Sequence, residues 1–158
     1  MSEIILKGII DEDFVNYRVP SMTLMFPNCT FKCGFSYCQN SSIVDSENIH
    51  INLDSLCKRY INNTISEAIV CQGLEPLDSW VELYNLIFTL RVIYKCHDDI
   101  VIYTGYKKEE IEHELLELEK YDNIIVKFGR FIPNQESHYD TILGVNLASD
   151  NQYAVKIS

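Results

Sequence analysis

The stretch EAIVCQGLEPLDSW, residues 67–80, carries the pattern from which the fold can be predicted. Its first half is a short apolar run that ends at Gly73, as expected of a strand buried on both faces. Its second half predicts the start of a helix, because Pro76 fixes the turn and Ser79 with Glu82 matches a capping box. A buried strand that leads directly into a helix is the repeating unit of an α/β fold.

The same alternation continues on both sides of this stretch. Helical patterns cover residues 53–62, 80–90 and 111–118, and apolar runs that predict strands lie at 3–10, 21–26, 100–104 and 124–128, with one or two more within 142–157. The chain shows no internal repeat or linker. We therefore predict one domain over residues 1–158, of α/β class, built as a partial (β/α) barrel with parallel strands.

Each predicted parallel strand is followed by an unusual motif. A cysteine loop follows residues 21–26, and the later strands are followed by GLEP at 73–76, YTGY at 103–106 and Gly129-Arg130. Right-handed crossovers line up the carboxyl ends of parallel strands along one edge, where sites in such folds lie. We expect these motifs to meet there, so that the functional site lies at the C-terminal strand edge.

The cysteine loop has the spacing Cys-x3-Cys-x4-Cys, formed by Cys29, Cys33 and Cys38. Thiolates this close can converge on one metal centre, and thiolate ligands favour iron–sulfur clusters, zinc or Cu(I). Structural zinc and most electron-transferring [4Fe–4S] clusters take four protein ligands, so three local cysteines leave one iron open.

A fourth protein ligand from elsewhere would instead give a zinc or ferredoxin-like site. The residues available for it are Cys57, Cys71, Cys96, His50 and His97. The three cysteines in this group lie in or beside apolar segments, and we interpret them as core residues.

The bulk composition narrows the classes of partner. The sequence has 13 Lys and Arg against 23 Asp and Glu, a net charge of −10, and no basic run, which argues against nucleic acid or an anionic membrane as partner. No export signal and no apolar run of spanning length is visible, so a cytoplasmic location is expected. Thiols stay reduced there, and six cysteines then favour metal or redox chemistry over disulfides.

The cysteine loop, GLEP and YTGY together resemble the radical S-adenosylmethionine enzymes. The family loop is Cys-x3-Cys-x2-Cys with an aromatic residue before its last cysteine. Here Tyr37 takes the aromatic position, and two residues are inserted before Cys38.

Within that superfamily, nearly the whole chain is similar to the small activating proteins of anaerobic ribonucleotide reductases. The likeness also rests on DFVN at 13–16, VKFGRF at 126–131 and SDNQ at 149–152. The chain departs from the family pattern at three positions: Leu74 replaces the second glycine of Gly-Gly-Glu-Pro, Phe128 an aspartate and Tyr153 an arginine.

The resemblance implies a [4Fe–4S] cluster held by Cys29, Cys33 and Cys38, with S-adenosylmethionine chelating the fourth iron, so that cluster and cofactor lie at the C-terminal strand edge. An electron from the reduced cluster would cleave the sulfonium C–S bond, and the resulting 5′-deoxyadenosyl radical would abstract a hydrogen atom. Glu75 is expected to accept from the cofactor's amino group, and Lys127 or Arg130 to meet its carboxylate. The cofactor-binding residues implied as a set are Tyr37, Gly73, Leu74, Glu75, Pro76, Thr104, Lys127 and Arg130.

The implied activity is that of an oxidoreductase, a glycyl-radical-enzyme activase. Its partners would be the catalytic subunit of an anaerobic ribonucleotide reductase, which receives the radical on a glycine, and a flavodoxin or ferredoxin-type reductant. Two alternatives remain open. One is a radical S-adenosylmethionine enzyme that acts on another peptide or a small molecule, and the other is a non-enzymatic iron–sulfur or zinc-binding module.

Overall fold

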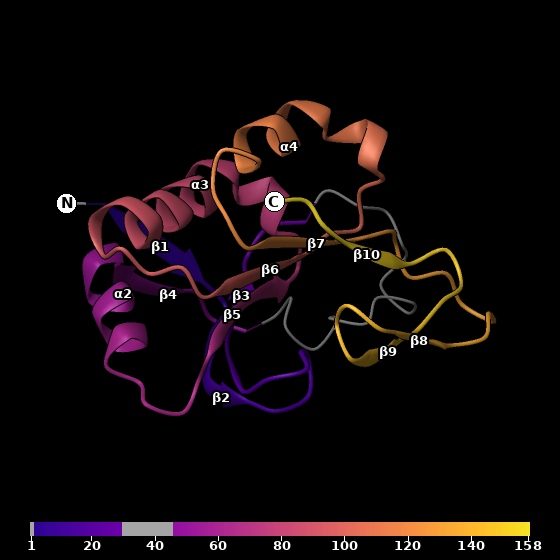
Figure 1. The fold of residues 1–158 in the computed structure, drawn as a ribbon, viewed down its shortest axis with the longest axis horizontal. Helices are drawn as coiled ribbons and strands as arrows, with labels where there is room; N and C mark the ends of the chain where they lie inside the picture. The colour runs from indigo at the N-terminus through magenta and orange to yellow at the C-terminus, as the bar shows by residue number, and fades with distance from the viewer. Residues whose placement is uncertain (1, 30–45) are drawn as a thin grey trace.

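The computed structural model describes residues 2–29 and 46–158, and its centre is a mixed sheet of six strands (Figure 1). Parallel strands form the middle, in the order β3 (Ser21–Phe26), β5 (Ala68–Gly73), β6 (Asp99–Tyr103) and β7 (Ile124–Phe128). Antiparallel strands form the two edges: β2 (Gly8–Asp13) beside β3 and β10 (Tyr153–Lys156) beside β7. Separate antiparallel pairs join β1 (Glu3–Leu6) to β4 (Ile49–Asn52) and β8 (His138–Asp140) to β9 (Val145–Leu147).

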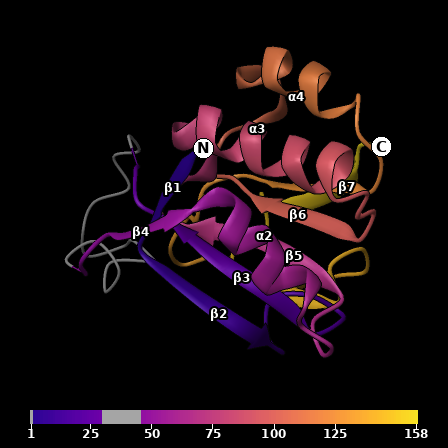
Figure 2. The same ribbon diagram turned by 90° about the vertical axis from the view of Figure 1, so that its left-hand side faces the viewer.

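The helices lie together on one face of this sheet (Figure 2). They are α2 (Leu53–Ile61), α3 (Trp80–Phe88) with a π-helical end (Thr89–Ile93), and α4 (Glu112–Leu118), with single 3-10 turns at Pro76–Ser79 and Lys108–Glu110. Their apolar stripes pack on strand residues such as Leu24, Cys71, Ile102 and Val126 to form the main core. No helix within the described ranges has the length and apolarity to cross a bilayer.

The opposite face of the sheet carries a smaller core, which the C-terminal segment covers. Val70, Val101 and Ile125 point to this face and pack with Leu143 and Leu147 from the region of the β8–β9 hairpin. Because side chains alternate along a strand, the residues two positions further on share the same face. They are Gln72, Tyr103 and Lys127, which lie at or one residue before the carboxyl ends of three neighbouring strands.

Most elements expected from the sequence are present, with two corrections. The strand expected at residues 3–10 is broken at Lys7, whose N–H donates to the Met25 carbonyl, so β1 and β2 join different sheets. The capping box expected at Ser79 and Glu82 is wrong. Ser79 makes no capping hydrogen bond, and Glu82 Oε2 accepts from the distant Ile5 N–H at 2.6 Å.

The parallel strands follow one another in the sheet in sequence order, with their helices on one face. This is also how (β/α) barrels are assembled. The partial barrel, however, stays a prediction.

Candidate functional site

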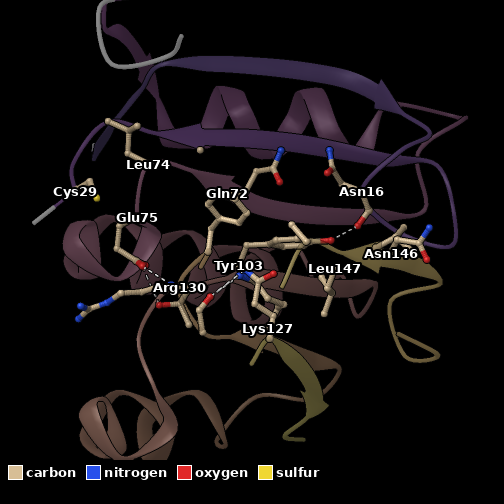
Figure 3. Close-up of a pocket in the computed structure, with 18 of the residues that line it drawn as sticks. Asn16, Cys29, Gln72, Leu74, Glu75, Tyr103, Lys127, Arg130, Asn146 and Leu147 are labelled. Carbon is tan, nitrogen blue, oxygen red and sulfur yellow. Dashed lines mark hydrogen bonds between the residues drawn. The ribbon is translucent and has the colours of Figure 1, made fainter. Parts of the chain in front are cut away.

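A cavity of about 370 Å³ opens at the carboxyl ends of the parallel strands (Figure 3). It brings together most of the site residues expected from the sequence: Cys29, Gly73, Leu74, Glu75, Thr104, Lys127 and Arg130. Pro76 does not line the cavity, because it is buried as the first residue of a 3-10 turn. Cys33, Tyr37 and Cys38 lie outside the described residues. The volume falls within the range of small-molecule sites, roughly 300–1,000 Å³.

Cys29 is held at the cavity by the turn that follows β5. The N–H of Leu74 donates to the Phe26 carbonyl at 2.9 Å, and the N–H of Glu75 donates to the Asn28 carbonyl at 2.8 Å. The Asn28 side chain adds a bond to Ser79 Oγ at 3.0 Å. The first residues of the cysteine loop are thus fixed to the GLEP turn, although the two segments are far apart in sequence.

Gly73 is required by the backbone at this junction. Its φ is +84°, and a Cβ built on it would lie 2.5 Å from the Met25 Cα and 2.8 Å from the Phe26 nitrogen. The close approach that this glycine permits is therefore to strand β3. Leu74 stands where the family pattern has a second glycine, and it is tolerated because its φ lies outside the left-handed region.

Glu75 is a buried carboxylate that ties two strand ends together. Its Oε1 accepts from Thr104 Oγ1 at 3.0 Å and from the Gly105 N–H at 2.7 Å, and its Oε2 accepts from the Leu77 N–H at 3.0 Å. Burial raises the pKa of this carboxyl to about 7, against the opposing effect of these hydrogen bonds. A carboxylate has about four acceptor positions, so one remains for a ligand.

Lys127 places a second buried charge in the same cavity. Its Nζ donates to the Gly129 carbonyl at 3.0 Å and lies 5.5 Å from the centre of the Tyr103 ring. Burial lowers the pKa of Lys127 to about 8, and the Glu75 carboxylate partly offsets that effect. A buried ammonium with one acceptor in the protein is suited to an anionic ligand.

Arg130 and Thr104 take different positions around these two charges. The Arg130 guanidinium is half exposed and lies 3.8 Å from a Glu110 carboxylate oxygen. Thr104 is fully buried, donates to Glu75 and accepts from the Tyr106 N–H at 3.0 Å. Arg130 thus lies nearer solvent, whereas Thr104 supports the Glu75 carboxylate.

The other two departures from the family pattern form one packing pair. Phe128 and Tyr153 are directly opposite in the β7–β10 register, and their ring centres lie 5.4 Å apart. Phe128 points into the main core, away from the cavity. An aromatic pair across two strands stabilises the sheet at this position.

Sequence reasoning missed several residues that line the cavity, chiefly Asn16, Gln72, Asn146 and Leu147, and it placed Tyr103 at the site only as part of the YTGY motif. Period-two alternation was the signal for Gln72 and Tyr103, since each lies two residues after a valine on the same face of its strand. Asn146 and Leu147 come from the short strand β9, which folds back over the sheet. Gln152 also lines the cavity, and its amide donates to the Gly129 carbonyl at 3.2 Å.

The remaining cysteines do not suit a fourth cluster ligand. Cys57 and Cys71 are fully buried in the main core. Burial raises the pKa of the Cys57 thiol to about 12, and it also raises the pKa of the Cys71 thiol. Ligation requires the thiolate, which such burial disfavours. Cys96 packs against the core on the segment after α3, and burial also raises the pKa of its thiol. These positions confirm Cys57 and Cys71 as core residues.

Among the described cysteines, Cys29 lines the cavity, and it is exposed. Within residues 2–29 and 46–158 no group of three His, Cys, Asp or Glu side chains is arranged for a metal ion. The residues therefore fit an iron–sulfur cluster if Cys29 is a ligand together with Cys33 and Cys38, as the sequence predicts.

Comparison with known proteins agrees with this donor chemistry. A family model described as a 4Fe-4S single cluster domain matches residues 17–153, which is most of the chain. No curated protein matches the sequence. The matched range includes the cysteine loop and every parallel strand of the sheet. The chain therefore belongs to the family of 4Fe-4S single cluster domains.

Proposed function

We propose that this protein is a radical S-adenosylmethionine enzyme that activates an anaerobic ribonucleotide reductase. The observation that carries the proposal is a pair of buried, opposite charges, Glu75 and Lys127, in the cavity that Cys29 also lines. The α-amino and carboxylate groups of S-adenosylmethionine carry the complementary charges.

Each charge would act on one end of the cofactor's amino-acid part. Glu75 has an acceptor position left for the ammonium, and a cation there would keep the carboxyl ionised despite its pKa of about 7. The Lys127 ammonium would meet the carboxylate, which would favour its charged form in the same way. Lys127 suits this role better than Arg130, because it is buried in the cavity and Arg130 lies nearer solvent.

The cluster, held by Cys29, Cys33 and Cys38, would supply the electron that cleaves the sulfonium C–S bond. The protein's part is to hold the cofactor and exclude water, and the tied ends of β3, β5 and β6 support a rigid site for it. The proposal keeps Gly73, Leu74 and Thr104 as lining residues and Pro76 as the residue that fixes the turn. It also keeps Tyr37 as a contact before the last cysteine.

The proposed radical acceptor is a glycine on the catalytic subunit of the reductase, with a flavodoxin or ferredoxin-type protein as reductant. A radical enzyme for another peptide or a small molecule is the second candidate, and the Leu74, Phe128 and Tyr153 departures keep it open. A non-enzymatic iron–sulfur module is the third.

Electron paramagnetic resonance separates these candidates. The protein is reconstituted anaerobically with iron and sulfide, reduced, and frozen with and without S-adenosylmethionine. The proposal predicts that the cofactor changes the spectrum of the reduced cluster and that adding a candidate reductase produces a glycyl radical. A spectrum that the cofactor leaves unchanged would favour the non-enzymatic module, and a changed spectrum without a glycyl radical would favour another substrate.

A further inference from the structure

One end of the cavity is lined by neutral residues that the proposed cofactor site does not use. The charged residues among those that line the cavity are Glu75, Lys127 and Arg130. In Figure 3, Cys29 and Glu75 lie at one end, Asn16 and Asn146 at the other, and Gln72 and Tyr103 between them. The residues named at this second end are therefore polar and neutral. Two charges border them: the Asp13 carboxylate accepts from the Asn16 side chain, and the Lys127 ammonium lies 5.5 Å from the centre of the Tyr103 ring.

Gln72 is held in a fixed place on the sheet. It is opposite Met25 in the parallel register, and it ends the face of β5 that also carries Val70. Tyr103 and Lys127 are paired in the same way on the next two strands. The half-buried Gln72 amide thus projects from the sheet into the cavity.

Two side-chain amides of this region have no hydrogen-bond partner within the described ranges. They belong to Gln72 on β5 and Asn146 on β9, and both line the cavity. Gln72 is half-buried and Asn146 is exposed. A half-buried amide such as that of Gln72 is unfavourable until water or a ligand supplies a partner. Each amide offers one acceptor and two donor hydrogens, so each can bond both a carbonyl and an N–H.

The mouth of this region is apolar and rigid. Val15 lines the cavity and is 74 % exposed, beside Phe14, which is 69 % exposed. The buried Asp13 carboxylate fixes this loop by accepting from the Val15 N–H at 2.8 Å and from the Asn16 side chain at 2.5 Å. The Tyr103 hydroxyl donates to the Asn16 carbonyl at 2.5 Å, so the loop is also tied to the sheet.

We propose that this end of the cavity holds an extended peptide segment, whose backbone carbonyl and N–H groups bond to the amides of Gln72 and Asn146. A peptide unit is neutral and presents a donor and an acceptor, which matches an amide side chain, whereas a phosphate would need a positive charge. The exposed Val15 and Phe14 supply apolar contact at the entrance. The proposal rests on the proposed function, in which the segment is the one that bears the radical-accepting glycine.

The test is a titration of the iron-loaded protein, with S-adenosylmethionine present, by blocked triglycine (N-acetyl-Gly-Gly-Gly-amide). Saturation-transfer difference NMR follows the weak binding of this probe. Gln72→Ala and Asn146→Ala should each raise its Kd about three- to ten-fold, the usual effect of losing one neutral hydrogen bond. A triglycine analogue with an ester in place of its central amide should bind the wild-type protein more weakly by a similar factor.

Asn85→Ala is the matched control, because Asn85 lies on α3, on the far face of the sheet, and should leave the Kd unchanged. Gln72→Glu guards against a packing defect, since it keeps the side-chain size and should still weaken binding of the peptide carbonyl. The proposal would be overturned if triglycine bound both Gln72→Ala and Asn146→Ala as tightly as the wild-type protein. It would also be overturned if triglycine did not bind the wild-type protein.

The same variants are assayed for cleavage of S-adenosylmethionine without a partner. This reaction should stay within two-fold of wild type in Gln72→Ala and Asn146→Ala. Absence of S-adenosylmethionine cleavage by the wild-type protein would count against the proposed function. Intact cleavage with unaltered peptide binding in the variants would count against the peptide subsite alone.

Discussion

Replacing Gly73 with alanine tests the junction that holds the cysteine loop to the sheet. The new methyl group would lie 2.5 Å from the Met25 Cα and 2.6 Å from its Cβ, on backbone that cannot move without breaking the β3–β5 pairing. An L-residue at φ +84° costs roughly 1–2 kcal/mol, and overpacking typically adds about 1–3 kcal/mol. Gly73→Ala should therefore lower the free energy of unfolding by about 2–5 kcal/mol, out of a typical total of about 5–15 kcal/mol.

Urea unfolding of the protein without iron, followed by the fluorescence of its single tryptophan, Trp80, measures this change. Gly8→Ala is the matched control, because its Cβ would meet the same residue, Met25, but at the mobile end of the side chain, 3.3 Å from Cε. That variant should differ from wild type by less than about 1 kcal/mol. Equal stability of the Gly73→Ala and Gly8→Ala variants would refute the geometry described for the junction.

Two further predictions concern the buried charges. The pKa of Glu75 is raised to about 7 from an ordinary value of 4.5, so its contribution to stability is full below 4.5 and lost as the pH rises through 7. Between pH 5 and pH 8 the wild-type protein should lose about 2–3 kcal/mol more stability than Glu75→Gln, measured by urea unfolding, and equal losses would contradict this. Lys127→Met should raise the Kd for S-adenosylmethionine about ten- to hundred-fold in equilibrium dialysis, because a charge-assisted bond is lost. Arg130→Met should raise the Kd for S-adenosylmethionine less than about three-fold. A larger increase in Arg130→Met than in Lys127→Met would show that Arg130 binds the carboxylate of the cofactor.

The parallel strands could be predicted because burial on both faces gives them continuous apolar runs. Residues 21–26 and 124–128 were expected as strands, and β3 and β7 have these bounds. The order of motifs along the sequence also located the cavity, since GLEP and Gly129-Arg130 both lie at strand ends, and the cavity is lined by the first three residues of GLEP and by Gly129 and Arg130. These features depend on local sequence, which is why they could be inferred without coordinates.

The errors arise where distant segments decide the outcome. Glu82 has the position of a capping residue, but its carboxylate instead accepts a hydrogen bond from the N–H of Ile5, 77 residues away. The strand β8 contains His138, Tyr139 and Asp140, which show no apolar pattern, and it forms by pairing with β9. Asn146 could not be assigned to the cavity from the sequence for the same reason, because only the folding of this hairpin over the sheet brings it there.

The most direct test of the account is reductive cleavage of S-adenosylmethionine by the iron-loaded protein. The protein is reconstituted anaerobically and reduced with dithionite, and 5′-deoxyadenosine and methionine are quantified by chromatography. The account predicts cleavage by the wild-type protein and by Cys96→Ala, and none by Cys29→Ala, because Cys29 lines the cavity and Cys96 packs beside the core. A wild-type protein that carries a full cluster and yet forms no 5′-deoxyadenosine would contradict it.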